Sequence, residues 1–256
     1  ILRSSSIPIA TESMIFADLD GNGTNDLIVA SQREIRVFNF TDYRFDQVAA
    51  YTFNLNTKIH ALSVLPGRQG QHSRLLVSAD GDKLPASAVL SWDGSKTLQL
   101  EKDNIGWYIR AVLMPGEGYF IAGQRLDPDT DAWILARGVY RLLLDQQTSR
   151  PISGNRLVLP EQAKLFDFVY ADINGDNLVE TIVIDDRQKL LVYNANNELL
   201  WVSSASYGGG LSFYGQQVSE VQADEPKDER ILQYLPGRLE VKDIDHNGTP
   251  EIIVNT

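Results

Sequence analysis

Cysteine is absent from the 256 residues of the chain. Its absence excludes disulfide bridges, thiolate catalysis and cysteine-ligated zinc, and it leaves the redox compartment of the protein undetermined. Histidine is scarce as well. His60, His72 and His246 share no metal-ligand spacing, so we expect them to occupy surface or turn positions.

Basic residues are outnumbered by acidic ones. Lysine and arginine total 23 against 34 aspartates and glutamates, which gives a formal net charge of −11. An acidic chain without a basic cluster repels phosphates, so we expect no nucleic-acid partner. No apolar run approaches the roughly 18 residues that a membrane-spanning helix requires, so we expect no transmembrane segment in this chain.

Familiar catalytic signatures are also missing. The sequence contains no G-x-S-x-G nucleophile elbow, no phosphate-binding loop and no dinucleotide-binding fingerprint. Paired carboxylates are plentiful, but their spacing suits metal ligation better than acid–base catalysis. We therefore expect no catalytic residues and no enzymatic activity.

The most informative feature present is a nine-residue acidic loop that occurs three times, at residues 18–26, 172–180 and 243–251. Each copy follows a short apolar segment and leads into an apolar, β-branched run typical of a strand. Oxygen-bearing side chains stand at loop positions 1, 3, 5 and 9 in every copy. In chain order they are Asp18, Asp20, Asn22 and Asp26; Asp172, Asn174, Asp176 and Glu180; and Asp243, Asp245, Asn247 and Glu251.

This spacing predicts calcium binding. Calcium takes six to eight oxygen ligands, and a tight loop can direct alternate side chains toward one centre while the acid at position 9 closes the site. Such a turn needs positive φ at positions 4 and 6, which glycine adopts freely and which Asn and His tolerate best among other residues. Those positions hold Gly21 and Gly23, Gly175 and Asn177, and His246 and Gly248.

A metal-free alternative stays open, because Asp-Gly and Asn-Gly are also the commonest hairpin turns. The retention of the position-9 acid in all three copies favours up to three calcium ions. Helix-flanked calcium loops are a poor alternative, since strand sequences follow each copy.

Repeats of similar layout organise the whole chain. Blade-like units are expected at about residues 12–55, 56–104, 105–160, 161–206 and 207–256, within a single domain; the second and third units lack the acidic residues. Four short strands per unit and the lack of a convincing amphipathic helix predict an all-β fold, a β-propeller of four-stranded blades. Four tryptophans recur roughly once per unit, and we expect core packing for them rather than sugar stacking: Trp92, Trp107, Trp133 and Trp201.

The strand–DxDGNG–strand motif in blade-sized units resembles the FG-GAP/VCBS repeat family of β-propellers, which includes the integrin α-subunit head and bacterial surface or envelope proteins. The resemblance implies calcium between the two inner strands of a blade, and a ring of seven blades. Because the fifth unit supplies only two strands before Thr256, we expect this chain to be a fragment of a longer protein.

Taken together, these features predict a calcium-stabilised, non-enzymatic scaffold that binds another protein or a surface glycan. Short loops of this kind suit millimolar extracellular calcium, so we expect an extracytoplasmic location: secreted, periplasmic or cell-surface. Two alternatives stay open, a calcium-dependent polysaccharide lyase or hydrolase built on a propeller, and a carbohydrate-binding lectin. Oligomeric state is not predicted.

Overall fold

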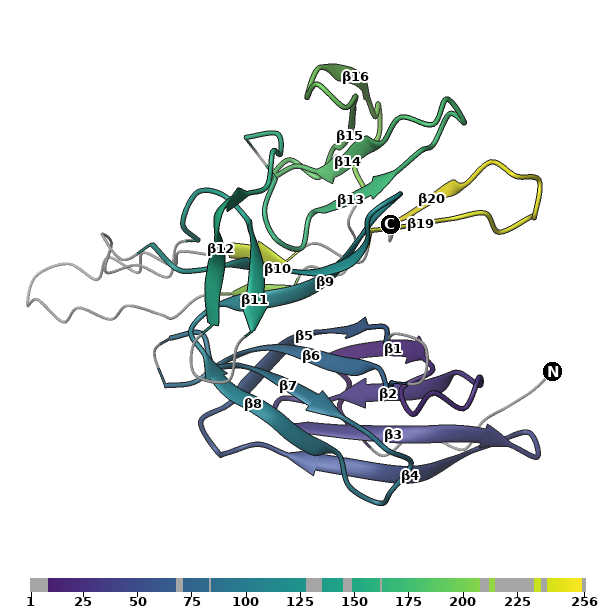
Figure 1. The fold of residues 1–256 in the computed structure, drawn as a ribbon, viewed down its shortest axis with the longest axis vertical. Helices are drawn as coiled ribbons and strands as arrows, with labels where there is room; N and C mark the ends of the chain where they lie inside the picture. Colours follow the sequence, from purple (N-terminus) through teal and green to yellow (C-terminus); the bar gives the residue numbers. More distant parts are fainter. Residues whose placement is uncertain are drawn as a thin grey trace, which may run out of the picture. The chain divides into compact units, whose positions relative to one another are not determined.

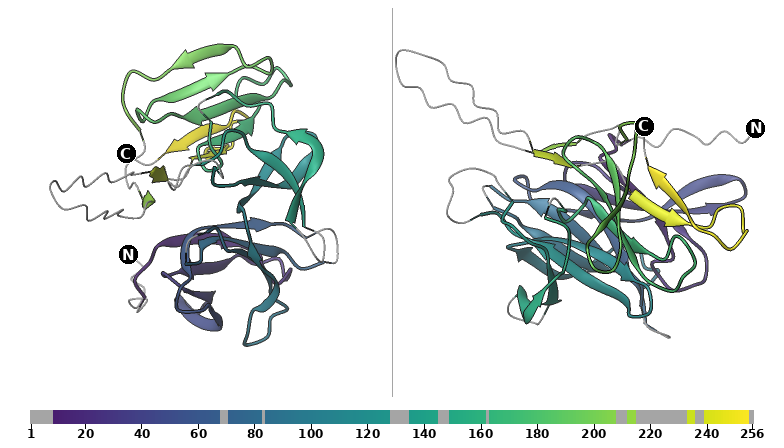
Figure 2. Two further views of the ribbon diagram at one scale, coloured as in Figure 1. Left: turned by 90° about the vertical axis from the view of Figure 1, so that its left-hand side faces the viewer. Right: turned by 90° about the horizontal axis from the view of Figure 1, so that it is seen from above.

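The computed structural model describes residues 9–67, 71–82, 84–127, 135–144, 149–161, 163–207, 212–214, 233–235 and 239–254 (Figures 1 and 2). Every regular element in these ranges is a β-strand. Within them, no helix of the length and apolarity needed to cross a membrane occurs.

Most of the described chain is arranged in four-stranded sheets whose strand order follows the sequence. The first sheet contains β1 (Ser13–Ala17), β2 (Asp26–Ala30), β3 (Glu34–Thr41) and β4 (Arg44–Thr52). The second contains β5 (Lys58–Leu65), β6 (Arg74–Asp80), β7 (Ser87–Ser91) and β8 (Gln99–Ile105). Neighbouring strands are antiparallel in both sheets.

The later sheets repeat this layout. The third contains β9 (Tyr108–Met114), β10 (Gly118–Gln124), β11 (Tyr140–Leu144) and β12 (Ser149–Arg156). The fourth contains β13 (Phe168–Ala171), β14 (Glu180–Ile184), β15 (Leu190–Tyr193) and β16 (Leu199–Val202). Two-stranded sheets follow, β17 (Ser212–Tyr214) with β18 (Gln233–Leu235), and β19 (Leu239–Lys242) with β20 (Glu251–Val254). The prediction of an all-β fold built from four-stranded propeller blades is confirmed.

The chain divides into two compact units. The first comprises residues 1–112, 119–123 and 141–155, and the second comprises residues 113–118, 124–140 and 156–256. The third sheet contributes residues to both units.

The core of the first unit lies between its first two sheets. Ile28 and Ile35 from the first sheet pack in one cluster with Leu75, Leu90 and Trp92 from the second, and each is at most 1% exposed. Burying one such aliphatic side chain contributes about 1.5–3 kcal/mol. Strand β1 lies beside β5, so this core holds the inner strands of two successive blades together.

The second unit is built in the same way. Ile182 and Leu190 of the fourth sheet pack against Leu239, Ile252 and Val254 of β19 and β20. Strand β13 lies beside β19, as β1 lies beside β5. Each acidic loop therefore belongs to a sheet whose apolar face is packed against another sheet.

Two expectations for single residues are corrected. Trp92 is buried, as expected, but Trp201 is 49% exposed because the outer strand β16 is exposed along its whole length. His60 is not a surface or turn residue: it lies on β5 with a 5% exposed side chain, its Nε2 2.7 Å from Asp80 Oδ2. Trp133 lies outside the described residues.

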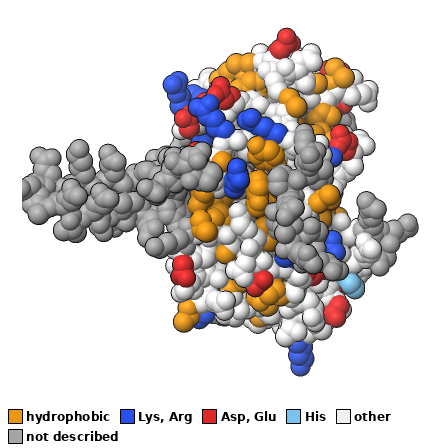
Figure 3. Space-filling model, turned by 60° about the vertical axis from the view of Figure 1, so that its left-hand side comes forward, with side chains coloured by type: hydrophobic (Ala, Val, Ile, Leu, Met, Phe, Trp, Pro, Cys, Tyr) orange, Lys and Arg blue, Asp and Glu red, His pale blue; other side chains and the backbone are white. Residues whose placement is uncertain are grey.

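Surface charge is mixed on the face shown in Figure 3. Lysine and arginine side chains lie among aspartates and glutamates there, with hydrophobic side chains between them. Among the coloured side chains of this face, the two signs are interspersed rather than gathered into one patch.

We expect the Trp92→Ala variant to lose about 3–5 kcal/mol of unfolding free energy, because it opens a cavity between two packed sheets. Trp201→Ala, at a half-exposed position, should cost about 1 kcal/mol. Urea unfolding followed by circular dichroism measures both. Equal losses in the two variants would contradict the assignment of Trp92 to the core.

Candidate metal centres

The three acidic loops occupy equivalent places in their sheets. They join β1 to β2, β13 to β14, and β19 to β20. In each case position 1 follows the last residue of one strand, and position 9 is the first residue of the next. The terminal ladder pairs are Ala17 with Asp26, Ala171 with Glu180, and Lys242 with Glu251. The sheet therefore fixes both ends of every loop.

The backbone of the three loops follows one course. Positions 4 and 6 have positive φ in every copy, which confirms the role expected of glycine, Asn and His there. The values are +76° and +85° for Gly21 and Gly23, +77° and +64° for Gly175 and Asn177, and +60° and +90° for His246 and Gly248.

One hydrogen bond recurs between loop positions 2 and 9. The backbone N–H at position 2 donates to the position-9 carboxylate at 3.0 Å from Leu19 to Asp26, 3.0 Å from Ile173 to Glu180 and 2.8 Å from Ile244 to Glu251. This bond turns the position-9 side chain back over the loop.

A second bond recurs between positions 1 and 6. The N–H groups of Gly23, Asn177 and Gly248 donate to Asp18, Asp172 and Asp243 at 2.8–2.9 Å. Two hydrogen bonds thus cross each loop, one between positions 2 and 9 and one between positions 1 and 6.

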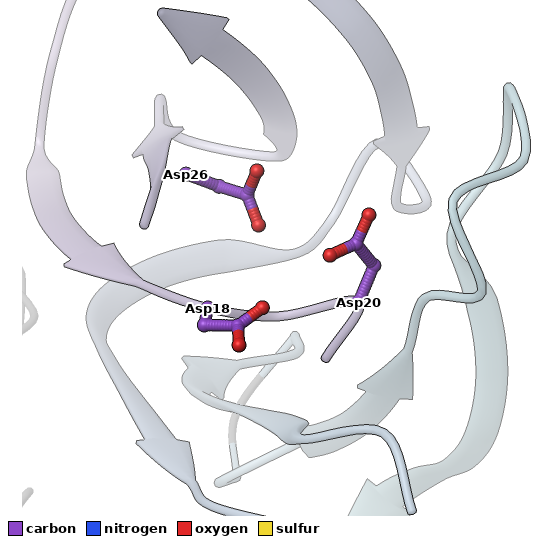
Figure 4. A group of neighbouring side chains, drawn as sticks. All are labelled: Asp18, Asp20 and Asp26. Atoms are coloured by element: carbon purple, nitrogen blue, oxygen red, sulfur yellow. The ribbon is translucent and has the colours of Figure 1, made fainter. Parts of the chain in front are cut away.

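Loop one brings three carboxylates together. Figure 4 shows the side chains of Asp18, Asp20 and Asp26 directed toward a common space, and one oxygen of each lies within 4.8 Å of the others. Calcium binds oxygen at about 2.3–2.6 Å, so ligands on opposite sides of one ion are separated by about 5 Å. The three oxygens fit that spacing.

One oxygen in this loop has no hydrogen-bond partner. Asp18 Oδ1 is buried and unpaired, although Asp18 Oδ2 accepts the bond from Gly23. A buried carboxylate oxygen without a donor is costly unless a cation or proton is present. Loop one therefore has a feature that fits a bound cation and that its acidic composition alone does not show.

The electrostatics of loop one support the same conclusion. Burial of the side chain, which is 1% exposed, raises the pKa of Asp26 from 3.8 to about 6. The neighbouring charges of Asp20 and Asp18 raise it further, whereas the hydrogen bond from Leu19 lowers it. These carboxylates repel one another when all are ionised, and a divalent cation would offset that repulsion.

Loop three has the same grouping in a more exposed setting. Asp243, Asp245 and Glu251 each place an oxygen within 4.8 Å of the others. The Asn247 amide N–H donates to Asp245 at 2.9 Å, as Asn22 donates to Asp20 at 3.0 Å in loop one. Position 5 thus orients the acid at position 3 in both copies.

Loop two is arranged differently, because it has the amide at position 3 and the acid at position 5, the reverse of loops one and three. The amide of Asn174, at position 3, donates to Asp176 at 3.0 Å and to Glu180 at 3.4 Å. Both oxygens of Asp172 accept backbone bonds, from Gly175 and Asn177, and in loop three both oxygens of Asp243 do the same. Among the described residues, only loops one and three bring three acidic side chains together.

Two residues that the sequence did not indicate reach loop one from the second sheet. The Ser73 hydroxyl donates to the Asp18 carbonyl oxygen at 2.9 Å, and His72 Nδ1 lies 2.7 Å from the Asp20 carbonyl oxygen. They are 55 and 52 residues away along the chain. No local pattern could have indicated them, because the contact depends on how the first two sheets pack.

In metal-free protein we expect Asp26 to make stability depend on pH. The pKa in the folded state, about 6, lies above the ordinary 3.8. The unfolded chain therefore loses its proton first, and stability falls between about pH 4 and pH 6 and stays lower above that range. Asp26→Asn should remove this loss, measured as the change in urea midpoint between pH 4 and pH 7 with chelator present. Asp46→Asn, at a half-exposed acid outside the loops that pairs with Arg44, should leave it unchanged.

Comparisons with known proteins leave the family of this chain unassigned. No protein-family model matches it, and no curated protein matches it. Among solved structures it is similar to the crystal structure of BBS1N in complex with ARL6DN, soaked with mercury. That similarity has a TM-score of 0.42 and 14% sequence identity, and it covers 95% of this chain and 88% of the other. At this level it assigns neither a partner nor an activity to this chain.

Proposed function

We propose that this chain is a calcium-stabilised, non-enzymatic β-propeller scaffold that binds a protein or glycan partner outside the cytoplasm. The observation that carries the proposal is in loop one. Three carboxylates converge there while the buried Asp18 Oδ1 has no hydrogen-bond donor. The repeated loop architecture agrees with the resemblance to FG-GAP/VCBS repeat propellers.

Calcium suits these loops better than other common metals. Every candidate ligand side chain is a carboxylate or an amide, and hard oxygen donors favour calcium or magnesium over zinc or copper. Magnesium demands near-ideal octahedral geometry at about 2.0–2.1 Å, whereas calcium accepts irregular sites. A loop whose ligands come from positions 1, 3, 5 and 9 of one short turn provides an irregular site.

The ion would act on stability rather than on a reaction. It would offset the repulsion among the acids and hold the connection between two inner strands in one conformation. The most enzyme-like cluster in the described chain, His60 with Asp80 and Tyr108, is closed to substrate. The His60 side chain is 5% exposed and Tyr108 is 2% exposed. Its bonds join β5, β6 and β9, which is a structural role.

An extracytoplasmic location follows from the affinity expected of such loops. Loop three is largely exposed, and its ligands come from one short segment. Calcium sites of extracellular modules bind in the range of about 10⁻⁴–10⁻³ M. Sites of this affinity fill in extracellular fluid, and a protein whose stability depends on them belongs there.

Calcium should raise the melting temperature of the protein by several degrees, and chelation should reverse the change. A site at a hundredfold excess of ligand over its dissociation constant adds about 2.7 kcal/mol of stability. Asp18→Asn and Asp243→Asn should each reduce both the shift and the number of ions bound, measured by calorimetric titration. Asp46→Asn should reduce neither.

The absence of bound calcium in wild-type protein, with no melting shift, would contradict the proposal. The acidic loops would then be hairpin turns held by their own hydrogen bonds, and the blade architecture would stand without metal. Binding of two ions rather than three would assign them to loops one and three, where three acids converge.

A further inference from the structure

We propose that Ser73 and His72, in the β5–β6 connection of the second sheet, are positioning residues for calcium in loop one of the first sheet. Calcium occupancy and the docking of these two sheets are then coupled. The inference rests on the proposed calcium binding and goes beyond it, because it assigns to loop one contacts with a neighbouring sheet that loops two and three do not make among the described residues.

Ser73 connects the loop to the core of the second sheet. It directly precedes β6 and is 8% exposed. Its hydroxyl donates to the Asp18 carbonyl oxygen at 2.9 Å and accepts the Gly67 N–H at 3.4 Å. A hydroxyl has one proton to donate, so Ser73 commits its only donor to the loop.

His72 holds Asp20, which carries the candidate ligand side chain at loop position 3. Its Nδ1 lies 2.7 Å from the Asp20 carbonyl oxygen. A carbonyl oxygen can only accept, so Nδ1 carries the proton in this bond. The β7–β8 connection borders the same residue, since a Cβ added to Gly94 would lie 3.5 Å from Asp20 Oδ2. Two connections of the second sheet therefore border Asp20, the β5–β6 connection and the β7–β8 connection.

These bonds act on the backbone while the ion would act on the side chains. The second sheet holds the carbonyl groups at loop positions 1 and 3, whose carboxylates point into the common space of Figure 4. Fixing a peptide group restricts where its side chain can reach, so less conformational freedom is lost when the ion binds. By linkage, an ion that holds the carboxylates also strengthens the bonds from Ser73 and His72.

Loops two and three lack this arrangement in the described chain. In loop two, no described residue outside the loop donates a hydrogen bond to the carbonyl groups of Asp172 and Asn174. The same holds in loop three for the carbonyl groups of Asp243 and Asp245. Their calcium would stabilise a hairpin within one sheet. Calcium in loop one would in addition stabilise the junction between two sheets.

The test measures calcium affinity in the 256-residue chain carrying Asp172→Asn and Asp243→Asn, which leaves loop one as the intact site. Ser73→Ala in this background should weaken calcium binding about fivefold or more, the lower range of typical coupling between sites. His72→Ala should weaken it in the same direction. Because His72 is exposed, that variant is expected to fold even where Ser73→Ala does not.

Ser78→Ala is the matched control. Ser78 is also a buried serine of the second sheet, and its hydroxyl donates to the Ile109 carbonyl oxygen at 2.7 Å on β9. Ser78 Oγ also accepts the Ile109 N–H at 2.8 Å, so the variant loses two bonds between sheets without touching loop one. It should lower the melting temperature and leave calcium affinity unchanged.

Hydrogen exchange supplies a reciprocal measurement that needs no change at Ser73. Calcium should slow amide exchange over residues 71–75 in wild-type protein and in Asp243→Asn, but not in Asp18→Asn. Unchanged exchange over these residues in calcium-bound wild-type protein would contradict the coupling.

The outcomes separate the two proposals. If the wild-type chain binds no calcium, the proposed function fails and the coupling fails with it. If loop one binds calcium with equal affinity in Ser73→Ala, His72→Ala and Ser78→Ala, the coupling alone is overturned.

Discussion

The hydrogen bond between loop positions 2 and 9 is the constraint on which the acidic loops depend. It joins the first residue of one strand to the backbone just beyond the preceding strand, at the terminal ladder pair. A single carboxylate oxygen thereby closes the loop and brings the acid at position 9 over the oxygen-bearing side chains at positions 1 and 3. Because the bond is made in all three copies, the differences among the loops do not arise from the way they are closed.

The local sequence pattern was sufficient to predict the strands and the backbone conformation of the acidic loops, because both depend on neighbouring residues. The β-branched runs after each acidic loop form strands, and positive φ falls at the two positions assigned to glycine, Asn and His. Tertiary packing decided the rest. His60 is buried because Asp80 and Tyr108 lie beside it, Trp201 is exposed because β16 is an outer strand, and Ser73 reaches Asp18 only across a sheet interface.

Equal spacing does not produce equal sites. Loops one and three hold an acid at position 3 and an amide at position 5, so the amide orients the acid and leaves the centre to oxygen. Loop two holds them in the reverse order, and the Asn174 amide N–H groups occupy the space between Asp176 and Glu180. Exchanging Asp and Asn between positions 3 and 5 thus places N–H donors in the centre of loop two, where loops one and three have carboxylate oxygens.

The order of the strands in the first sheet has a consequence for recognition. In an antiparallel meander the β1–β2 and β3–β4 connections share one end, and the connection of β2 to β3 lies at the other. The acidic loop is therefore at the same end as the β3–β4 turn, where Tyr43 is 76% exposed. The affinity of a partner that binds at this end would depend on the calcium concentration. The affinity of a partner that binds at the opposite end would not.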